Sequence, residues 1–202
     1  MTHRRSFQLL LLAMLALFAP LFVPGCANYD ELVEKDQKAA QKWSDVEATL
    51  QRRADLIPNL VETAKASAKF EKETLEAVTK ARADATAIKM DAAALTDPAK
   101  MKAFVEAQGQ LKGALGKLLV ASEKYPELKA NENFKGLQVQ LEGTENRILR
   151  AREEYNKAVA EYNTALGKVR GQAINKATGH PFKPREFFHM EASAAVAPKV
   201  SF

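Results

Sequence analysis

An unbroken apolar stripe runs through the last long segment of the chain and limits what that segment can fold into. Between residues 137 and 169, apolar or small residues recur at steps of three and four. This spacing places them on one face of an α-helix, and Leu141 and Ile148, at the centre of the stripe, are predicted core residues. The stripe comprises Leu137, Leu141, Thr144, Ile148, Ala151, Tyr155, Val159, Tyr162, Leu166 and Val169.

The same spacing recurs in the rest of the chain. Residues 32–78 repeat it with Asp36 as a polar interruption, and residues 101–125 repeat it with Gln108 and Ser122 among the stripe positions. No comparable stretch alternates with the period of two that a half-buried strand requires. The sequence therefore predicts an all-α protein.

Prolines and capping residues set the predicted helix ends. Asp97 before Pro98 is a strong helix start, and Pro126 ends that helix because the residue before a proline is pushed away from the helical conformation. Asn131 or Asn133 can cap the next helix. Since short turns join consecutive helices as antiparallel neighbours, an up-and-down four-helix bundle is expected, with helices at 28–54, 56–92, 98–125 and 133–169.

Pro58 is the ambiguous point in this division, because the first stripe passes through it in register. One helix from residue 28 to residue 90 would be roughly 95 Å long at 1.5 Å per residue, too long for a domain of this size to cover. We therefore expect a break there. Asp55 then caps the second helix, and Arg52 and Arg53 lie at the negative end of the first.

The N-terminal residues are typical of an exported lipoprotein. Arg4 and Arg5 precede an uninterrupted apolar run at residues 9–19. Residues 9–25 number 17 and contain two prolines, fewer than the roughly 20 apolar residues that a membrane span needs. Val23-Pro24-Gly25-Cys26 resembles a lipobox, so residues 1–25 are predicted to be a signal peptide and Cys26 the acylated first residue of the mature chain. An uncleaved N-terminal anchor in the inner membrane is the alternative.

Charge and cysteine content exclude other classes of protein. Of the 30 basic residues, two lie in residues 1–25, so the mature chain carries 28 basic and 25 acidic residues, or +3. This interspersed charge does not provide the basic surface of a nucleic-acid-binding protein. Cys26 is the only cysteine, which excludes an intrachain disulfide. Ala27 is not the aspartate that retains some lipoproteins in the inner membrane, so in a Gram-negative host we expect the outer membrane, facing the periplasm.

The residue types for catalysis or metal binding are poorly placed. His3 lies in the predicted signal, and His180 and His189 lie in the tail, away from every helical stripe. The carboxylates of the last helix alternate with arginines and lysines, which is typical of a solvated face. Neither a cofactor nor a metal is expected. The carboxylates considered for a paired site are Glu142, Glu145, Glu153 and Glu154.

Asn146 and Arg147 lie beside the stripe of the last helix, where they could be partly buried. One interpretation makes them a recognition patch. The other makes them a polar layer that fixes helix register through hydrogen bonds to Asp36 or Gln108, because buried polar groups need partners. Both stay open at this stage, with the polar layer favoured.

The C-terminal segment, residues 179–202, has no helical stripe and is predicted to be an irregular tail after a bundle of residues 26–178. Its prolines and its Phe182, Phe187 and Phe188 fit an extended arm that binds a partner. The other interpretation is that these phenylalanines cover the end of the bundle, because exposing them would forfeit about 1.5 to 3 kcal/mol each.

Three stretches together resemble the LemA family of bacterial envelope proteins: WSDVEATLQRRADLIPNLVETAK from Trp43, YPELKANENFKGLQVQLEGTENRILRAREEYNKAVAEYN from Tyr125, and the terminal APKVSF. The resemblance covers essentially the whole mature chain. It implies a four-helix bundle held at the bacterial membrane by an N-terminal anchor, and it implies no reaction.

Three classes of function are therefore considered. The first is a lipid-anchored, non-enzymatic envelope protein that binds unidentified envelope proteins, and every feature above fits it. The second is a carrier of lipid or another small ligand, which needs a cavity in the bundle. The third is a hydrolase acting in the envelope, for which the sequence supplies no nucleophile with its base.

The lipobox generates the first testable prediction. Mass spectrometry of the membrane-extracted protein should find a diacylglyceryl adduct on Cys26, and Cys26→Ser should release or mis-process the chain, because the acyl chains provide the stable anchor. An intact N-terminus at Met1 in the unmutated protein would contradict lipidation.

Overall fold

The computed structural model describes residues 2–66, 70–177, 179 and 182–189, and the side chains among these from residue 29 on, except at 169 and 170. These residues form helices and no strand, so the predicted all-α class is confirmed. The elements are α1 (Thr2–Lys65), α2 (Lys72–Ala87), the 3-10 turn η1 (Ala94–Thr96), α3 (Pro98–Ser122), α4 (Pro126–Ala130), α5 (Glu132–Gly167) and α6 (Val169–Ala177).

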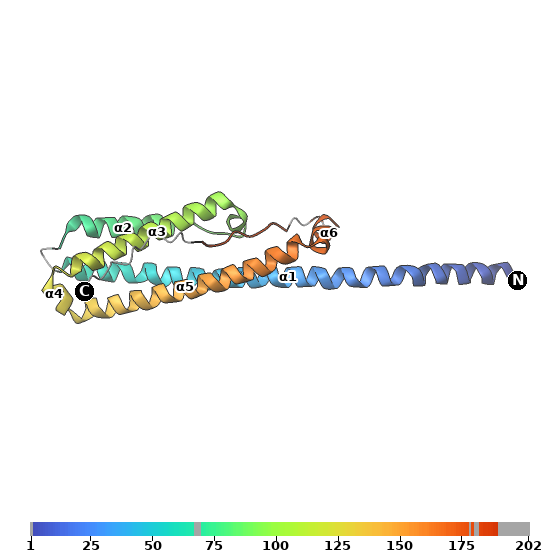
Figure 1. Ribbon diagram of the computed structural model, residues 1–202, viewed down its shortest axis with the longest axis horizontal. Helices are drawn as coiled ribbons and strands as arrows, with labels where there is room; N and C mark the ends of the chain where they lie inside the picture. Colours follow the sequence, from blue (N-terminus) through green and yellow to red (C-terminus); the bar gives the residue numbers. More distant parts are fainter. Residues whose placement is uncertain (1, 67–69, 178, 180–181, 190–202) are drawn as a thin grey trace, which may run out of the picture.

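The four long helices α1, α2, α3 and α5 alternate in direction, and α1 and α5 form the most extensive pair (Figure 1). The hairpin of α2 and α3 is shorter and packs over only one part of this pair. The helix α1 also extends well beyond the other helices toward its N-terminus. Part of the apolar face between α1 and α5 is therefore not covered by the hairpin.

The core consists of three clusters along α1. The first joins Ile57, Leu60 and Ala64 to residues of α2, α3 and the start of α5, and it contains Leu141. The middle cluster surrounds Trp43 and contains Ile148. The third joins Leu32 to Tyr162 and Leu166 of α5, without a residue from α2 or α3. Leu141 and Ile148 are only 3% and 2% exposed, which confirms both as core residues.

Two predicted helix starts are confirmed in detail. The Asp97 carboxylate accepts hydrogen bonds from the backbone of Ala99 at 2.9 Å and Lys100 at 3.2 Å, and Pro98 occupies the first turn of α3. Asn131, rather than Asn133, caps α5. In both cases a side-chain oxygen replaces the intrahelical acceptor that the first amides of a helix lack.

The predicted break at Pro58 is wrong. The helix α1 continues through Pro58 to Lys65, and α2 is confined to residues 72–87 instead of 56–92. Asp55 is therefore not a cap; it accepts a hydrogen bond from Gln51 on the exposed face of α1. Residues 28–90 do not form one helix, but the helix ends after Lys65 and not at Pro58, because the part of α1 before Lys65 packs along the 36-residue α5 (Figure 1).

A side chain from α2 compensates for Pro58. A proline has no N–H, so in a helix the carbonyl four residues earlier, here that of Ala54, loses its partner. Ala54 is only 2% exposed, and water therefore has little access to this carbonyl. The Arg82 Nε of α2 donates to the Ala54 oxygen at 2.7 Å. A tertiary contact thus supplies the hydrogen bond that the local sequence removes.

The N-terminal part of α1 carries the predicted signal and Cys26, but the side chains of residues 1–28 lie outside the described part of the structure. Within the part that is described, no helix combines the length and the apolar character needed to cross a membrane.

The contact between Arg82 and Ala54 can be tested with a double-mutant cycle. Arg82→Met should lower the free energy of unfolding by about 1 to 3 kcal/mol, because it leaves a buried carbonyl unpaired. In a Pro58→Ala background the restored N–H can donate to the Ala54 carbonyl, so the same substitution should cost less. Urea denaturation of the four proteins measures the difference.

Lys80→Met is the matched control, since Lys80 is exposed on the same helix and pairs with Asp84 one turn away. It should change the stability by less than about 0.5 kcal/mol. An equal cost of Arg82→Met with and without Pro58 would contradict the compensation.

Candidate arm-binding groove

An extended segment of the tail lies along α5 and is the most extensively bonded non-helical part of the described chain. We call residues 182–189 the arm. The surface that holds it, the arm groove, is formed by α1, α5, α6 and the loop of residues 91–97. Several residues of this groove bind the main chain of the arm.

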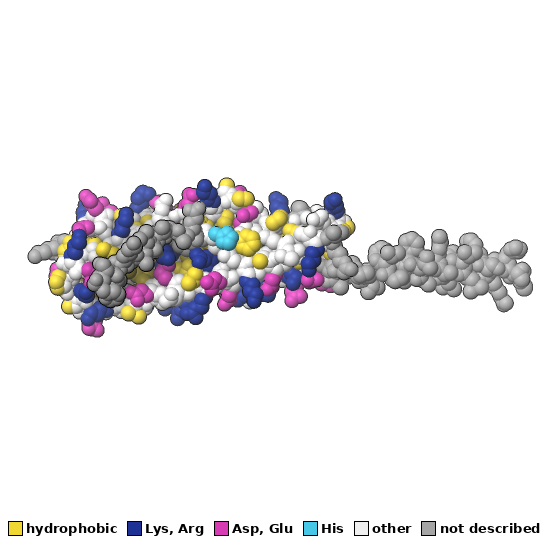
Figure 2. All heavy atoms as spheres, in the orientation of Figure 1, with side chains coloured by type: hydrophobic (Ala, Val, Ile, Leu, Met, Phe, Trp, Pro, Cys, Tyr) yellow, Lys and Arg dark blue, Asp and Glu magenta, His cyan; other side chains and the backbone are white. Residues whose placement is uncertain are grey.

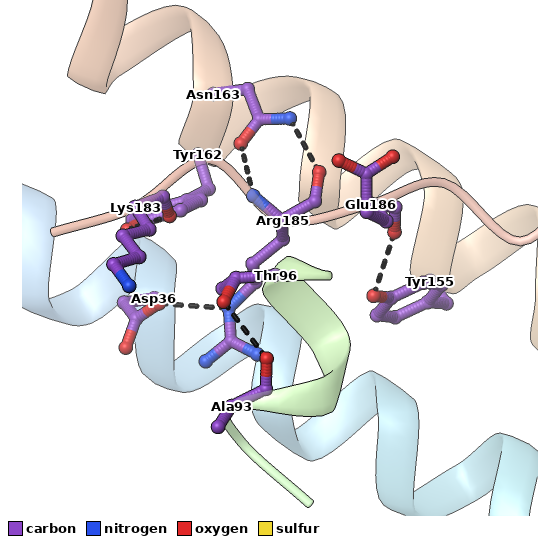
Figure 3. Close-up of polar contacts among 9 residues, drawn as sticks. All are labelled: Asp36, Ala93, Thr96, Tyr155, Tyr162, Asn163, Lys183, Arg185 and Glu186. Atoms are coloured by element: carbon purple, nitrogen blue, oxygen red, sulfur yellow. Dashed lines mark hydrogen bonds and ion pairs between the residues drawn. The ribbon is translucent and has the colours of Figure 1, made fainter. Parts of the chain in front are cut away.

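Three asparagines each bind one arm residue through both its N–H and its C=O. Asn163 accepts from the N–H of Arg185 and donates to its carbonyl, both at 2.9 Å (Figure 3). Asn156 holds Phe188 in the same way at 2.8 and 3.2 Å, and Asn175 of α6 holds Phe182 at 2.6 and 3.0 Å. A carboxamide can make this paired contact because it carries a donor and an acceptor side by side.

The spacing on α5 matches the repeat of an extended chain. Asn156 and Asn163 are seven residues apart, which corresponds to about 10.5 Å along a helix. Their arm partners Phe188 and Arg185 are three residues apart, about 10 Å in an extended chain. The helix and the arm are therefore in register over two contacts, with the arm antiparallel to α5.

Two tyrosines with the same spacing add hydrogen bonds. The Tyr155 hydroxyl donates to the Glu186 carbonyl at 2.9 Å, and the Tyr162 hydroxyl donates to the Lys183 carbonyl at 3.0 Å. On the other side of the arm, the N–H of Glu186 donates to the Leu95 carbonyl at 2.8 Å. The arm is thus bonded to α5 and to the loop before α3.

Both hydroxyls stay protonated in the groove. Burial raises the pKa of Tyr162 to about 12. The nearby Asp36 carboxylate also raises this pKa, whereas the positive charge of Arg185 lowers it. Burial also raises the pKa of Tyr155 far above its usual range, again opposed by Arg185. Each hydroxyl therefore remains a neutral donor to the arm carbonyl that it contacts.

Phe188 is the apolar anchor of the arm. It is completely buried and packs against Trp43 of α1 and Phe104 of α3, with ring centroids 6.0 and 5.6 Å apart. Trp43 in turn packs edge-on against Tyr155 at 5.0 Å. One arm residue therefore completes an aromatic cluster to which three helices contribute.

The other two tail phenylalanines are partly buried. Phe182 packs on the third core cluster and contacts Tyr29 edge-on at 6.0 Å. Phe187 packs beside the middle cluster and stacks on His189 at 5.2 Å. The tail aromatics therefore pack on the bundle, but along its side instead of over its end as expected. Residues 190–202 and His180 lie outside the described part.

Arg185 is the charged anchor of the arm. It is 7% exposed, and its Nε donates to the Asp36 carboxylate of α1 at 2.8 Å (Figure 3). Its guanidinium carbon also lies 5.9 Å from the centroid of the Tyr162 ring. The Nη1 atom is buried with no hydrogen-bond partner among the described residues. Asp36, the polar interruption of the first stripe, is thus explained by an arginine of the tail.

A buried polar layer exists at Gln108, but its partner there is Arg53. Arg53 is completely buried, donates to the Glu145 carboxylate at 2.7 Å and also donates to the Gln108 side chain. Gln108 in turn donates to the Ala85 carbonyl at 3.1 Å. The expected role of Arg53 at a helix end is therefore wrong, because α1 does not end there. The layer links α1, α2, α3 and α5.

Asn146 and Arg147 are both exposed on α5 and do not contact Asp36 or Gln108. The polar-layer interpretation is therefore wrong for these two residues. Asn156 and Asn163 were not among the predicted site residues. A signal for them is present: Glu-Tyr-Asn occurs at residues 154–156 and again at 161–163, one heptad apart.

The surface outside the groove carries both charges interspersed, as the face in Figure 2 shows. Glu145 pairs with Arg53, and Glu154 pairs with Lys42 at 2.6 Å. Among the described residues, no group of three or more histidine, cysteine or carboxylate side chains could hold a metal ion. A hollow of about 710 Å³ lies between α1 and α2, lined by apolar residues such as Phe70 and Leu75 and by exposed lysines.

The chain is similar to known proteins over most of its length. Residues 42–202 match the model of the LemA family. The magnetosome protein MamQ of Magnetospirillum gryphiswaldense is 31% identical over 80% of this chain, which spans 65% of that relative. Two MamQ proteins of Paramagnetospirillum magneticum are each 27% identical over 88% of this chain and 69% of their own length.

The asparagine contacts can be tested by comparing two substitutions on α5. Asn163→Ala should lower the free energy of unfolding by about 1 to 3 kcal/mol, because the N–H and C=O of Arg185 lose their partners in a partly buried site. Asn146→Ala, an exposed position on the same helix, should change it by less than about 0.5 kcal/mol. Equal effects in urea denaturation would mean that the groove does not hold the arm in solution.

Proposed function

This chain belongs to the LemA family, and from that membership we propose a non-enzymatic protein of the bacterial envelope, anchored to the membrane, that binds extended protein segments in the arm groove. The groove is occupied by the chain's own arm, which serves as a template for its ligands. Binding proteins to one another at a membrane, rather than a reaction, is then the molecular role.

The recognition of the main chain by asparagines is the observation that carries this proposal. Asn156, Asn163 and Asn175 bind N–H and C=O groups, which every protein segment has, at the three-residue repeat of an extended chain. Binding an extended peptide through its main chain, with pockets for alternate side chains, is a recurring mode of peptide recognition. In this groove, Phe188 and Arg185 occupy the two positions that select for side chains.

Specificity then follows from those two anchors. The aromatic site around Trp43 favours a large apolar residue, and Asp36 favours an arginine three residues before it. A ligand with an uncharged residue in place of the arginine would leave the partly buried Asp36 without its partner, which is costly. The ligand class is therefore an extended segment with the pattern Arg-x-x-Phe.

The proposed anchor and the groove would lie close together. Among the side chains that the structure describes, the first buried core residue is Leu32, six residues after Cys26 and about 9 Å along a helix. A lipid on Cys26 would place the end of the bundle that contains α6 next to the membrane. The groove would then begin there, because Phe182 at the start of the arm contacts Tyr29.

A carrier of an apolar ligand is the second candidate, and the hollow lined by Phe70 and Leu75 favours it. Its exposed lysines Lys65, Lys72 and Lys80 are each paired with an acidic residue of the same helix, so no charge is left over for an anionic headgroup. The groove therefore supports binding of protein segments better than the hollow supports binding of lipid.

A labelled peptide tests the proposed function. The peptide HPFKPREFFHM, residues 180–190, is titrated against the protein shortened after Gly179, whose helical fold is checked by circular dichroism. Fluorescence anisotropy should show saturable binding, because the groove keeps its asparagines and its aromatic site. The peptide with Arg185→Ala or Phe188→Ala should bind at least about tenfold more weakly, equivalent to 1.4 kcal/mol.

Two controls complete this experiment. The shortened protein with Asn146→Ala should bind like its parent, whereas the one with Asn163→Ala should bind more weakly. A folded, shortened protein that fails to bind the peptide, or binds a scrambled version equally well, would refute the groove as a binding site.

A further inference from the structure

We infer that the arm groove accepts the arm of a second copy of this chain, so that two copies join by exchanging arms. This inference rests on the proposed function, because it names the occupant of the same groove. The occupant is argued from the match between arm and groove, from the polar groups that an empty groove would expose, and from the junction before the arm.

The arm matches its groove at both charge and shape. The buried Arg185 meets the Asp36 carboxylate at 2.8 Å, and Phe188 is completely enclosed beside Trp43 and Phe104. A second copy carries the same arginine and phenylalanine at the same spacing. Its arm can therefore repeat every contact of the first. The pattern Arg-x-x-Phe also occurs at residues 4–7, but these residues lie in the predicted signal peptide.

An empty groove would be unfavourable. When an arm leaves its groove, we therefore expect the arm of another copy to take its place. Without an arm, Asp36 would lose its ion pair, and Tyr155 and Tyr162 would lose the acceptors of their buried hydroxyls. The aromatic cluster around Trp43 would also open to water. Because a second arm restores all of these contacts, exchange conserves them while release alone does not.

The junction before the arm suits such an exchange. The helix α6 packs on α1 and α5 of its own chain, so the arm alone would change places. Gly179 between them has φ +64°, a left-handed conformation that glycine adopts without strain, and a change at this residue redirects the chain. The five Cα steps from Ala177 to Phe182 span at most about 18 Å, so the exchanging copies must meet near their α6 helices.

The first measurement uses the unmutated chain. Two copies with different affinity tags are co-expressed, extracted in detergent and captured through one tag. The second tag should be recovered with the first, and ending both chains after Gly179 should reduce this recovery at least about tenfold. If unmutated chains do not capture each other, or shortened chains do so equally well, the inference is wrong.

Charge reversal then shows whether the arm crosses between copies. Asp36→Arg in one tagged chain and Arg185→Asp in the other each place like charges together when the arm stays in its own groove. Exchange between the two variants pairs opposite charges in both grooves. The mixed variants should therefore capture each other and melt higher than either variant alone.

The double variant Asp36→Arg with Arg185→Asp in one chain is the matched control, because it restores opposite charges in either arrangement. Recovery of its melting temperature without recovery in the mixed variants would show that the arm stays in its own groove, and would overturn the inference. If the peptide of residues 180–190 still binds the shortened protein in that case, the proposed function stands and only arm exchange is wrong.

Discussion

The antiparallel packing of α1 against α5 is the contact on which the rest of the structure depends. Both helices are longer than the hairpin of α2 and α3, so their shared apolar face continues past the hairpin. An exposed apolar face of this length would be unstable in water. The loop of residues 88–97, the helix α6 and the arm cover what the hairpin leaves, and Phe188 fills the centre of the middle cluster. The arm is therefore part of the core, although it is an extended segment outside the helices.

Several side chains have roles that their neighbours in the sequence do not explain: they provide hydrogen-bond partners for main-chain groups elsewhere in the structure. Arg82 donates to the carbonyl that Pro58 leaves without an N–H partner. Asn156 and Asn163 bind the main chain of the arm, which belongs to no helix or strand that would pair it. An extended segment packed on a helix has unpaired N–H and C=O groups at every residue, and burying them unpaired would cost free energy. The groove solves this with carboxamides and tyrosine hydroxyls that bind the main chain of the arm.

Periodicity predicted the buried face of every long helix correctly, because burial on one face leaves a repeat of three and four in the residues themselves. The stripe also runs through Pro58 in register. The break predicted there came from the helix length and the proline, and it was wrong because a contact from another helix allows α1 to continue. The site residues were predicted less well. Phe188 was recognised as a residue that needs a surface. Arg53 was assigned to a helix end that does not exist, Asn146 was expected in a polar layer that it does not join, and Asn156 and Asn163 were not identified.

The sequence by itself determined the all-α class, the cap Asp97 and the face that each long helix buries, and it limited the cap of α5 to Asn131 or Asn133, because each depends on residues within one or two turns of one another. Only the tertiary structure decided that α1 runs through Pro58, that Arg53 is paired inside the bundle, and that Asp36 binds Arg185 of the arm. Each of these outcomes depends on a contact between residues far apart in the sequence. The separation is 28 residues for Ala54 and Arg82, whose contact allows α1 to pass Pro58, 92 for Arg53 and Glu145, and 149 for Asp36 and Arg185. A contact over such a separation has no period in the sequence, because it depends on how the helices pack and not on the rise and turn of any one of them.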